Sequence, residues 1–416
     1  MTSPHERPAF EIGTLPNGLR WIHQHVASPA GHVGLILQTG SRDEGPDEEG
    51  LAHFIEHLLF KGTTRRKAYH ILSRIEDVGG ELNAYTGKED TTLYASFLVE
   101  HYGRSMELIF DIIQNARFPE KEIPKEKEVI LDEIDSYRDS PSELIFDEFD
   151  ALLFGDHPLG RNILGTEESV PKFTREQVVD FVQRNYRPEN AVLSSVGGIS
   201  AKAFERLAMK YAAHWTVPGQ SPERLAAPKI QPKTDLRELD IHQCHVVLGG
   251  TGFDAHHVDL PALVLVNNLL GGPAMNSRLN LNIRERHGIA YQIESFLNPY
   301  SDTGIWGVYA GTDEDAIDRC QRLILRELKL LRENRLGVGQ FSKAKTQLLG
   351  QMALAQESNG NLMTALGKSL LTFNRVDSFE EMVTKINAVT PSQMLEVANR
   401  VYDPQQITEL RFVPRS

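Results

Sequence analysis

The pattern of apolar and polar residues predicts that one series of elements occurs twice along the chain. An extended apolar run, "HVGLILQTGSRDEG", precedes the apolar helix around "GLAHFIEHLLF", and much later "CHVVLGGTGFDAHH" precedes a second one, "LPALVLVNNLLGG". Strand-like runs and then further helices follow in both halves. In the first half the strands are expected at 81–86 and 91–99, and the helices at 102–115, 124–140 and 143–154. In the second half the strands are expected at 289–296 and 304–310, and the helices at 314–334 and 341–356.

A segment without periodicity separates the two halves. "HWTVPGQSPERLAAPKIQPKTD" contains four prolines, which is typical of a linker. We therefore expect two homologous domains at 1–214 and 236–416, joined by a linker at 215–235. The predicted fold class is α+β, each domain a largely antiparallel sheet with helices packed on one face. The dipeptide Asn17-Gly18 between apolar runs predicts a hairpin between the first strands.

The first apolar helix carries three polar residues on one side. At 3.6 residues per turn, His53, Glu56 and His57 gather opposite the leucines and isoleucine of "GLAHFIEHLLFKGT". Histidines four residues apart lie one turn apart and can bind one cation, and Glu56 is better placed to act on a metal-bound water than to bind the metal. The order His-x-x-Glu-His is the inverzincin signature. The alternative is a pair of solvated helix histidines.

The repeat provides an internal comparison for this motif. When the two apolar helices are aligned by their Leu-Leu pairs, Val264, Asn267 and Asn268 occupy the three positions in the second half. The fold therefore does not require the polar trio, and only the first domain is expected to hold a metal.

The helix in "PKEKEVILDEIDSYRDSP" offers a third ligand. Glu126 and Glu133, seven residues apart, fall on its apolar side, where a carboxylate without a partner is costly, so a buried cation is a natural explanation. His53, His57 and Glu133 would form a zinc site with an open position, and Glu126 would support the ligands from behind as part of the catalytic site. For Glu126 the alternative is a partner of the helix dipole.

These motifs resemble the pitrilysin and insulinase family, particularly its half-length members related to mitochondrial processing peptidase. The similarity covers "HFIEHLLFKGT" and Glu133, which 75 residues separate from His57. It also covers "LPNGLRW", "GGELNAYTGKEDTTLYAS", "YRPENAVLSSVGG" and "LLGGPAMNSRLNLNIRERHGIAYQI". The proline in "GGPAMNSR" departs from the glycine-rich loop of the family.

The resemblance implies a zinc-dependent endopeptidase with one Zn²⁺ per chain that hydrolyses extended peptides in an enclosed chamber. Glu56 would be the general base on a zinc-bound water, and the residues matching the family's substrate or transition-state contacts are Arg284 and Tyr291. A peptide substrate would add to a strand edge formed by Asn83, Ala84, Tyr85 and Thr86.

Composition limits the classes of binding partner and the cellular compartment that we expect for this chain. The formal net charge of -13 argues against nucleic-acid binding, and no apolar run approaches the roughly 20 residues of a membrane span. The N-terminus shows no secretory signal pattern, so a cytoplasmic location is expected. The two cysteines, Cys244 and Cys320, lack the spacing of a zinc site and are expected to be buried thiols.

Two assemblies and one other class of function remain open. A homodimer is the first expectation, because this chain holds both the zinc motif and the Arg284 and Tyr291 pair. The alternatives are a catalytic subunit that needs a different, metal-free partner chain, and a non-catalytic scaffold or substrate-binding subunit. Scaffold members of the family typically lose a ligand or the glutamate, whereas this chain keeps all four residues.

Overall fold

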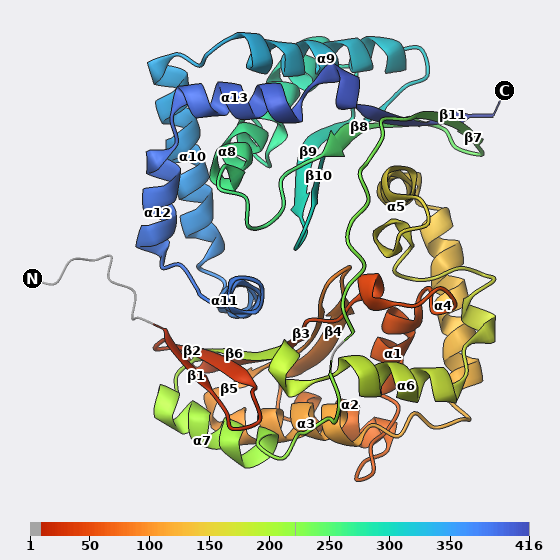
Figure 1. Ribbon diagram of the computed structural model, residues 1–416, viewed down its shortest axis with the longest axis vertical. Helices are drawn as coiled ribbons and strands as arrows, with labels where there is room; N and C mark the ends of the chain where they lie inside the picture. Colours follow the sequence, from red (N-terminus) through yellow and green to blue (C-terminus); the bar gives the residue numbers. More distant parts are fainter. Residues whose placement is uncertain (1–9, 221, 416) are drawn as a thin grey trace, which may run out of the picture. The chain divides into compact units, whose positions relative to one another are not determined.

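The computed structural model describes residues 10–220 and 222–415 and divides into two compact units (Figure 1). Unit 1 consists of Met1–Ile134, Asn162–Leu225 and Leu354–Ser378, and unit 2 consists of Asp135–Arg161, Ala226–Ala353 and Phe379–Ser416. Each unit contains one β-sheet with helices packed on it, so the α+β class with two sheets is confirmed.

The strands of unit 1 form a six-stranded sheet in the order β1-β2-β6-β3-β5-β4. Its strands are β1 (Glu11–Thr14), β2 (Arg20–His25), β3 (Ala30–Leu37), β4 (Glu81–Thr86), β5 (Thr91–Leu98) and β6 (Ala191–Gly197). Only β2 and β6 pair in parallel, so the sheet is largely antiparallel as predicted. The expected Asn17-Gly18 turn joins β1 to β2, with Gly18 in the left-handed region at φ 89°.

The helices associated with unit 1 come from three separate parts of the chain. They are α1 (Leu51–Leu59), α2 (Ala68–Glu76), α3 (Tyr102–Asn115), α4 (Ile123–Arg138, whose last four residues belong to unit 2), α6 (Arg175–Asn185), α7 (Ala201–Ala212) and α11 (Asn359–Phe373). The short 3-10 helices are Ser41–Asp43, Val99–His101, Val170–Lys172 and Pro188–Asn190.

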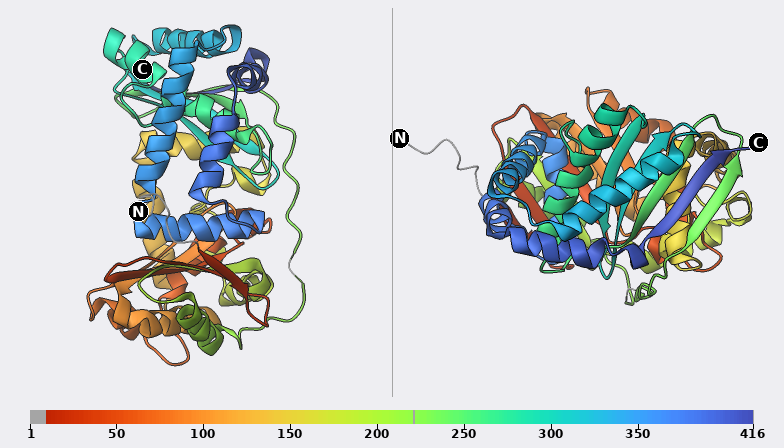
Figure 2. Two further views of the ribbon diagram at one scale, coloured as in Figure 1. Left: turned by 90° about the vertical axis from the view of Figure 1, so that its left-hand side faces the viewer. Right: turned by 90° about the horizontal axis from the view of Figure 1, so that it is seen from above.

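Helices cover both faces of this sheet. On one face Trp21, Val33 and Leu193 pack in the main core with α1, α3 and α7. On the other face Ile36 and Val192 pack against the leucines and Met363 of α11, which lies across the strands in Figure 2.

The strands of unit 2 form a five-stranded sheet in the order β7-β11-β8-β10-β9. Its strands are β7 (Thr234–Leu239), β8 (Cys244–Thr251), β9 (Gln292–Pro299), β10 (Gly304–Thr312) and β11 (Thr408–Pro414). The helices of unit 2 are α5 (Pro141–Phe154), α8 (Leu260–Gly271), α9 (Ile317–Glu333), α10 (Val338–Ala355, whose last two residues belong to unit 1), α12 (Phe379–Ala388) and α13 (Pro391–Val401), with short helices at Pro158–Gly160 and Pro404–Gln406 and a π-helix at Asn280–Glu285.

This second sheet is also covered on both faces. Helices α8, α9 and α13 cover one of them (Figures 1 and 2), where Val246 and Val308 are buried. On the other face Val247 and Tyr309 pack against Phe149 of α5. The expectation of helices on one face therefore needs correction: strands such as β6 and β8 are apolar on both sides, and a helix from the other half of the sequence covers the second side.

The expected elements lie close to their predicted positions. Strand β4 and helix α3 have the predicted ends, and the other ends that were predicted differ by at most three residues. Both cysteines are free and buried as predicted, and burial raises the pKa of the Cys320 thiol to about 11.

The predicted linker has no regular structure between His214 and β7 in the residues that the structure describes. Its first part is bound to unit 1. The buried guanidinium of Arg187 donates hydrogen bonds to the carbonyls of Val217, Pro218 and Gly219, and Arg224 forms an ion pair of 2.7 Å with Asp43. The domain boundaries at 214 and 236 remain a prediction about the repeat, whereas the packing units follow a different division of the chain.

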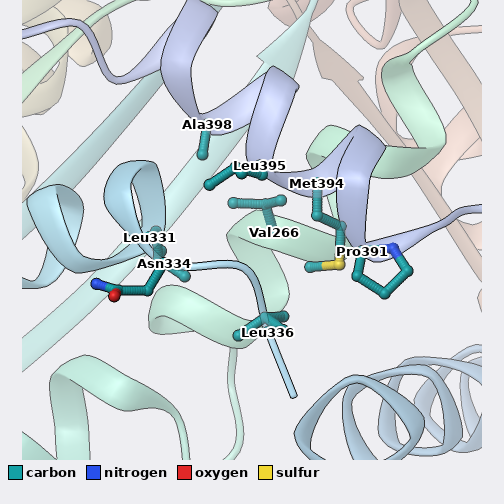
Figure 3. A pocket seen from close by; sticks show the side chains of 8 residues that line it. All are labelled: Val266, Leu331, Asn334, Leu336, Pro391, Met394, Leu395 and Ala398. Atoms are coloured by element: carbon teal, nitrogen blue, oxygen red, sulfur yellow. The ribbon is translucent and has the colours of Figure 1, made fainter. Parts of the chain in front are cut away.

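Two further observations concern membranes and cavities. None of the helices among the described residues is both long and apolar enough to cross a membrane. Figure 3 shows a cavity of about 10 Å³ between α8, α9 and α13, lined by apolar side chains such as Leu331 and Met394. A space of this size holds at most a single water molecule, so it cannot be a ligand site.

Candidate metal centre

Helix α1 carries the polar trio, and its N-terminus is held by a carboxylate. The buried side chain of Glu44 accepts hydrogen bonds from the N–H groups of Gly50 (3.1 Å) and Ala52 (2.8 Å). A negative charge at this end satisfies free amides and interacts favourably with the helix dipole. The start of the helix, and with it the direction of its polar side, is therefore well determined.

The two sides of α1 have different surroundings. Phe54, Ile55 and Leu58 are fully buried in the core of unit 1. On the opposite side His53 is 8% exposed, and its ring lies 4.7 Å from that of His57, centroid to centroid. The apolar stripe of the helix thus fixes both histidines side by side at the edge of the core.

Helix α4 brings the expected carboxylate to the histidines. The Oε2 atom of Glu133 lies 4.0 Å from Nε2 of His53 and 3.8 Å from Nε2 of His57. One ligand atom from each of the three residues lies within 4.8 Å of the others. The three predicted ligands, which come from two helices of unit 1, are therefore brought together.

The other carboxylate on α4 contacts the far side of one histidine. Oε2 of buried Glu126 lies 3.3 Å from Nδ1 of His57, and Oε1 lies 2.6 Å from Nζ of Lys61. A His57 tautomer with its proton on Nδ1 leaves Nε2 free to bind a metal. Sequence reasoning placed Glu126 here but missed Lys61, although Lys61 follows His57 by four residues.

The donor set fits a zinc ion. Two imidazole nitrogens and one carboxylate oxygen are ordinary zinc ligands, and bonds of about 2.1 Å in a tetrahedron put the ligand atoms about 3.4 Å apart. The observed separations of 3.8 and 4.0 Å need only small side-chain movements to reach that value. Among the described residues, the buried Nδ1 atom of His53 has no hydrogen-bond partner.

Burial keeps one ligand neutral. Desolvation, followed by the nearby His57, lowers the pKa of His53 to about 3. Its imidazole is therefore uncharged near neutral pH, which is the form that binds a metal.

Glu56 is placed beside the ligands and is oriented by a strand. The hydroxyl of Thr86, at the end of β4, donates a hydrogen bond of 2.6 Å to Oε2 of Glu56. Burial raises the pKa of Glu56, while the Thr86 hydrogen bond acts in the opposite direction. A raised pKa brings a carboxylate closer to the range that suits a general base. The orienting role of Thr86 was not foreseen from the sequence.

The predicted substrate strand lies at an edge of the sheet. Strand β4 pairs only with β5 among the described strands. The side-chain oxygen of Asn83 accepts a hydrogen bond of 2.8 Å from the N–H of Ala84, and the ring of Tyr85 lies 5.0 Å from Nζ of Lys368. One side of β4 thus has no strand neighbour among the described strands, and an extended chain can add there.

Comparison with known proteins identifies the family. The model of the insulinase family of peptidases, M16, matches residues 22–167, and the model described as the peptidase M16 inactive domain matches residues 172–348. An uncharacterized zinc protease of Bacillus subtilis, YmxG, is 31% identical over 392 residues, which cover 94% of this chain and 95% of that protein. The chain belongs to the insulinase family, M16.

Other known proteins resemble the chain over a similar extent. An uncharacterized zinc protease of Rickettsia bellii is 33% identical over 396 residues, covering 94% of this M16 chain and 95% of the relative. The crystal structure of a protease from Helicobacter pylori has a TM-score of 0.92 at 23% identity and covers 98% of this chain and 100% of its own. That likeness shows that the fold is shared.

The second half of this M16 chain carries Val264, Asn267 and Asn268 at the positions that align with His53, Glu56 and His57. In unit 2, Asn267 of α8 lies beside the edge strand β9, where Ser295 donates a hydrogen bond of 2.9 Å to its carbonyl. Within residues 10–220 and 222–415, the group formed by His53, His57 and Glu133 is the one set of three potential metal ligands.

Arg284 and Tyr291 belong to unit 2. Arg284 lies in the π-helix Asn280–Glu285 and donates a hydrogen bond of 3.3 Å to Oδ1 of Asn280. The exposed hydroxyl of Tyr291 donates to the carboxylate of Asp313 at 3.0 Å, and this hydrogen bond raises the pKa of the phenol. Both side chains thus form these hydrogen bonds within unit 2. Their participation in a site with α1 remains a prediction.

Proposed function

We propose that this chain is a zinc-dependent endopeptidase that hydrolyses extended peptides. The convergence of His53, His57 and Glu133, with Glu56 beside them, carries the proposal. The family membership and the names of its relatives, which are called zinc proteases, support the same chemistry.

In this proposal the three ligands hold one Zn²⁺ per chain. When bound, zinc acts as a Lewis acid that polarises a carbonyl and lowers the pKa of water. The hydrogen-bond acceptor Glu126 would hold the proton of His57 on Nδ1, and Lys61 pairs with the other oxygen of Glu126.

Glu56 is assigned the proton transfers. One of its carboxylate oxygens accepts the Thr86 hydrogen bond, so the other can accept a proton from the attacking water and pass it to the departing amine. Its raised pKa makes the carboxylate a stronger base than a solvated one, which favours the first transfer, the acceptance of a proton from water.

The edge strand β4 would bind the substrate as an additional strand. Backbone pairing along Asn83–Thr86 gives affinity with little dependence on the substrate's side chains, so broad specificity is expected. Arg284 and Tyr291 are proposed to donate hydrogen bonds to the substrate or the developing oxyanion, either in their own chain or in a partner. A cytoplasmic homodimer that encloses the substrate in a chamber is the proposed working form.

The test combines a peptide assay with metal analysis. Purified protein should hold about one zinc per chain and cleave a fluorogenic peptide, and a chelator should abolish cleavage. Glu56→Gln should lower kcat by at least about a thousandfold while zinc content stays unchanged, because the amide cannot accept the proton. Glu76→Gln, at an exposed position of α2, is the matched control and should retain full activity.

Two outcomes would contradict the proposal in different ways. Full cleavage by Glu56→Gln would refute the role of Glu56. Absence of cleavage by the pure wild-type protein would favour a scaffold subunit, or a catalytic subunit that needs a different partner chain.

A further inference from the structure

One acidic residue lies on the apolar side of α9. Ile324 and Leu328 of this helix are buried in the core of unit 2, and Glu327 beside them is only 5% exposed. A carboxylate in such surroundings is costly unless polar or charged groups compensate it. The groups that bind Glu327 therefore indicate what this carboxylate does.

Both carboxylate oxygens of Glu327 are bound by one short segment. Oε2 accepts a hydrogen bond of 2.8 Å from Nε of Arg278, and Oε1 accepts one of 3.0 Å from Nδ2 of Asn282. Arg278 precedes the π-helix Asn280–Glu285, whereas Asn282 lies inside it. Glu327 thus attaches this segment to α9 at two points.

The π-helix is also held by contacts of its own. The side-chain amide of buried Asn280 donates to the carbonyl of Met275, and its oxygen accepts a hydrogen bond of 3.3 Å from Nη1 of Arg284. Leu279 and Ile283 are fully buried in the core of unit 2. The backbone that carries Arg284 is therefore fixed by the core on one side and by the carboxylate of α9 on another.

Most of the guanidinium of Arg284 remains available for binding. Arg284 is exposed, and within residues 10–220 and 222–415 it forms no ion pair. A guanidinium has five N–H donors, and the hydrogen bond to Asn280 uses one of them. The other donors can bind a carbonyl or carboxylate oxygen of another molecule.

A π-helix makes the direction of its side chains sensitive to such contacts. π-helical turns are rare and frequently lie at functional sites. Return of this turn to the α-helical hydrogen-bond pattern would shift the register by one residue, which turns a side chain by about 100° around the helix axis. A buried ion pair is weak evidence for stability, because well-packed apolar residues often replace it without loss. The contacts of Glu327 therefore favour a role in selecting one conformation of the π-helix.

We propose that Glu327 is a positioning residue that holds the π-helix in the conformation in which Arg284 contacts the substrate. The inference rests on the proposed function, in which Arg284 donates hydrogen bonds to the substrate or the developing oxyanion. Glu327 itself contacts no reacting group and acts through Arg284. A misplacement of about 1 Å in such a group can lower the rate about a hundredfold, so the anchoring of the π-helix affects catalysis.

The test is a double-mutant cycle measured with a fluorogenic peptide. Arg284→Ala is expected to lower kcat/KM at least about a hundredfold, as the loss of an oxyanion donor does. Glu327→Gln should lower kcat/KM about tenfold in the otherwise wild-type protein, because an amide offers one acceptor oxygen in place of two. In the Arg284→Ala background the same substitution should change kcat/KM less than about twofold, since the group that it positions is absent.

A milder variant and a matched control accompany the cycle. Asn282→Ala removes one of the two contacts and keeps the buried ion pair, so the fold should persist. It should lower kcat/KM about threefold to tenfold with unchanged zinc content and unchanged urea unfolding. Glu333→Gln removes an exposed ion pair, with Lys329 at 3.7 Å, from the same helix and should behave as wild type.

Hydrogen exchange followed by mass spectrometry tests the anchoring without peptide cleavage. The amides of residues 279–288 should exchange about tenfold faster in Glu327→Gln and Asn282→Ala than in the wild-type protein, because the segment loses contacts that restrain its opening. Equal exchange rates in all three proteins would overturn the inference.

The outcomes separate this inference from the proposed function. Losses from Glu327→Gln and Arg284→Ala that multiply in the double variant would overturn the inference, because Glu327 would then act on the fold in general. Wild-type activity of Glu327→Gln and Asn282→Ala, with a loss in Arg284→Ala, would overturn it and leave the proposed function intact. Full activity of Arg284→Ala would refute the assigned role of Arg284 and this inference together. Absence of cleavage by the wild type would refute the proposed function, and the exchange rates would then decide whether Glu327 holds the π-helix.

Discussion

At the scale of single residues, two carboxylates on α4 contact the same histidine from opposite sides. Glu133 faces Nε2 of His57, whereas Glu126 faces Nδ1 and is paired with Lys61. The first is placed to bind a metal and the second to hold the imidazole in one tautomer. Seven residues, about two helical turns, separate them, and that spacing puts both on the side of α4 that faces α1.

Glu126→Gln is expected to weaken zinc binding about 10- to 100-fold, because the amide still accepts a hydrogen bond from Nδ1 but lacks the negative charge that makes His57 a stronger ligand. Zinc content after dialysis against graded chelator concentrations measures the effect. Glu128→Gln, at an exposed position on the same helix, should not differ from wild type. Equal zinc retention by both variants would contradict the supporting role of Glu126.

Thr86→Val is expected to lower kcat/KM for a peptide about tenfold with unchanged zinc content, because Glu56 loses the hydrogen bond that orients it. Thr86→Ser keeps a hydroxyl and should recover most of the activity. Loss of zinc together with activity would instead indicate that Thr86 matters for the structure of the site.

At the scale of elements, strands buried on both sides require two layers of helices. Strand β6 is buried along its whole length, with Val192 and Val196 facing α11 and Leu193 facing the main core. A helix can approach such a sheet closely only at a position where the helix residue that faces the sheet has a small side chain. Gly367 of α11 meets this condition: a Cβ atom there would lie 2.3 Å from Cδ1 of Ile36.

Gly367→Ala is expected to lower the free energy of unfolding by roughly 1–3 kcal/mol, because the added methyl group overpacks the contact with Ile36. Urea unfolding provides the measurement. Gly350→Ala in α10 is the matched control, since a Cβ there has no neighbour within 4 Å. It should leave stability unchanged or raise it by about 0.5–1 kcal/mol through helix propensity. A stabilising Gly367→Ala would show that α11 does not pack as described.

At the scale of the whole molecule, the compact units are not the two halves of the sequence. Unit 1 takes α11 from the second half, and unit 2 takes α5 from the first half. Each sheet therefore depends on a helix that is distant in sequence, and an isolated half would expose one apolar face.

Fragments 1–225 and 226–416 are expected to be unstable when expressed separately. Each would expose an apolar sheet face whose covering helix contributes several kcal/mol through its buried leucines and aromatic residues. Binding of a hydrophobic dye and the loss of cooperative unfolding report this state. Co-expression should restore a soluble complex, because each fragment supplies the helix that the other lacks. Cooperative unfolding of 1–225 alone, at wild-type stability, would contradict this dependence.

Much of the fold and of the site could be predicted because the signals are local. The 3.6-residue period of α1 places His53, Glu56 and His57 on one side whatever surrounds the helix, and turn residues and apolar runs define strands such as β4 to within a few residues. The acidic residues on the apolar side of α4 pointed to Glu126 and Glu133 for the same reason.

Tertiary structure alone decided which distant segments meet. No local pattern states that α11 covers β6, that Lys61 pairs with Glu126, or that basic side chains from separate segments line one pocket. Periodicity determines which side of an element is apolar or charged, but the partner of that side depends on how the chain folds back over hundreds of residues, which the spacing within one element does not encode.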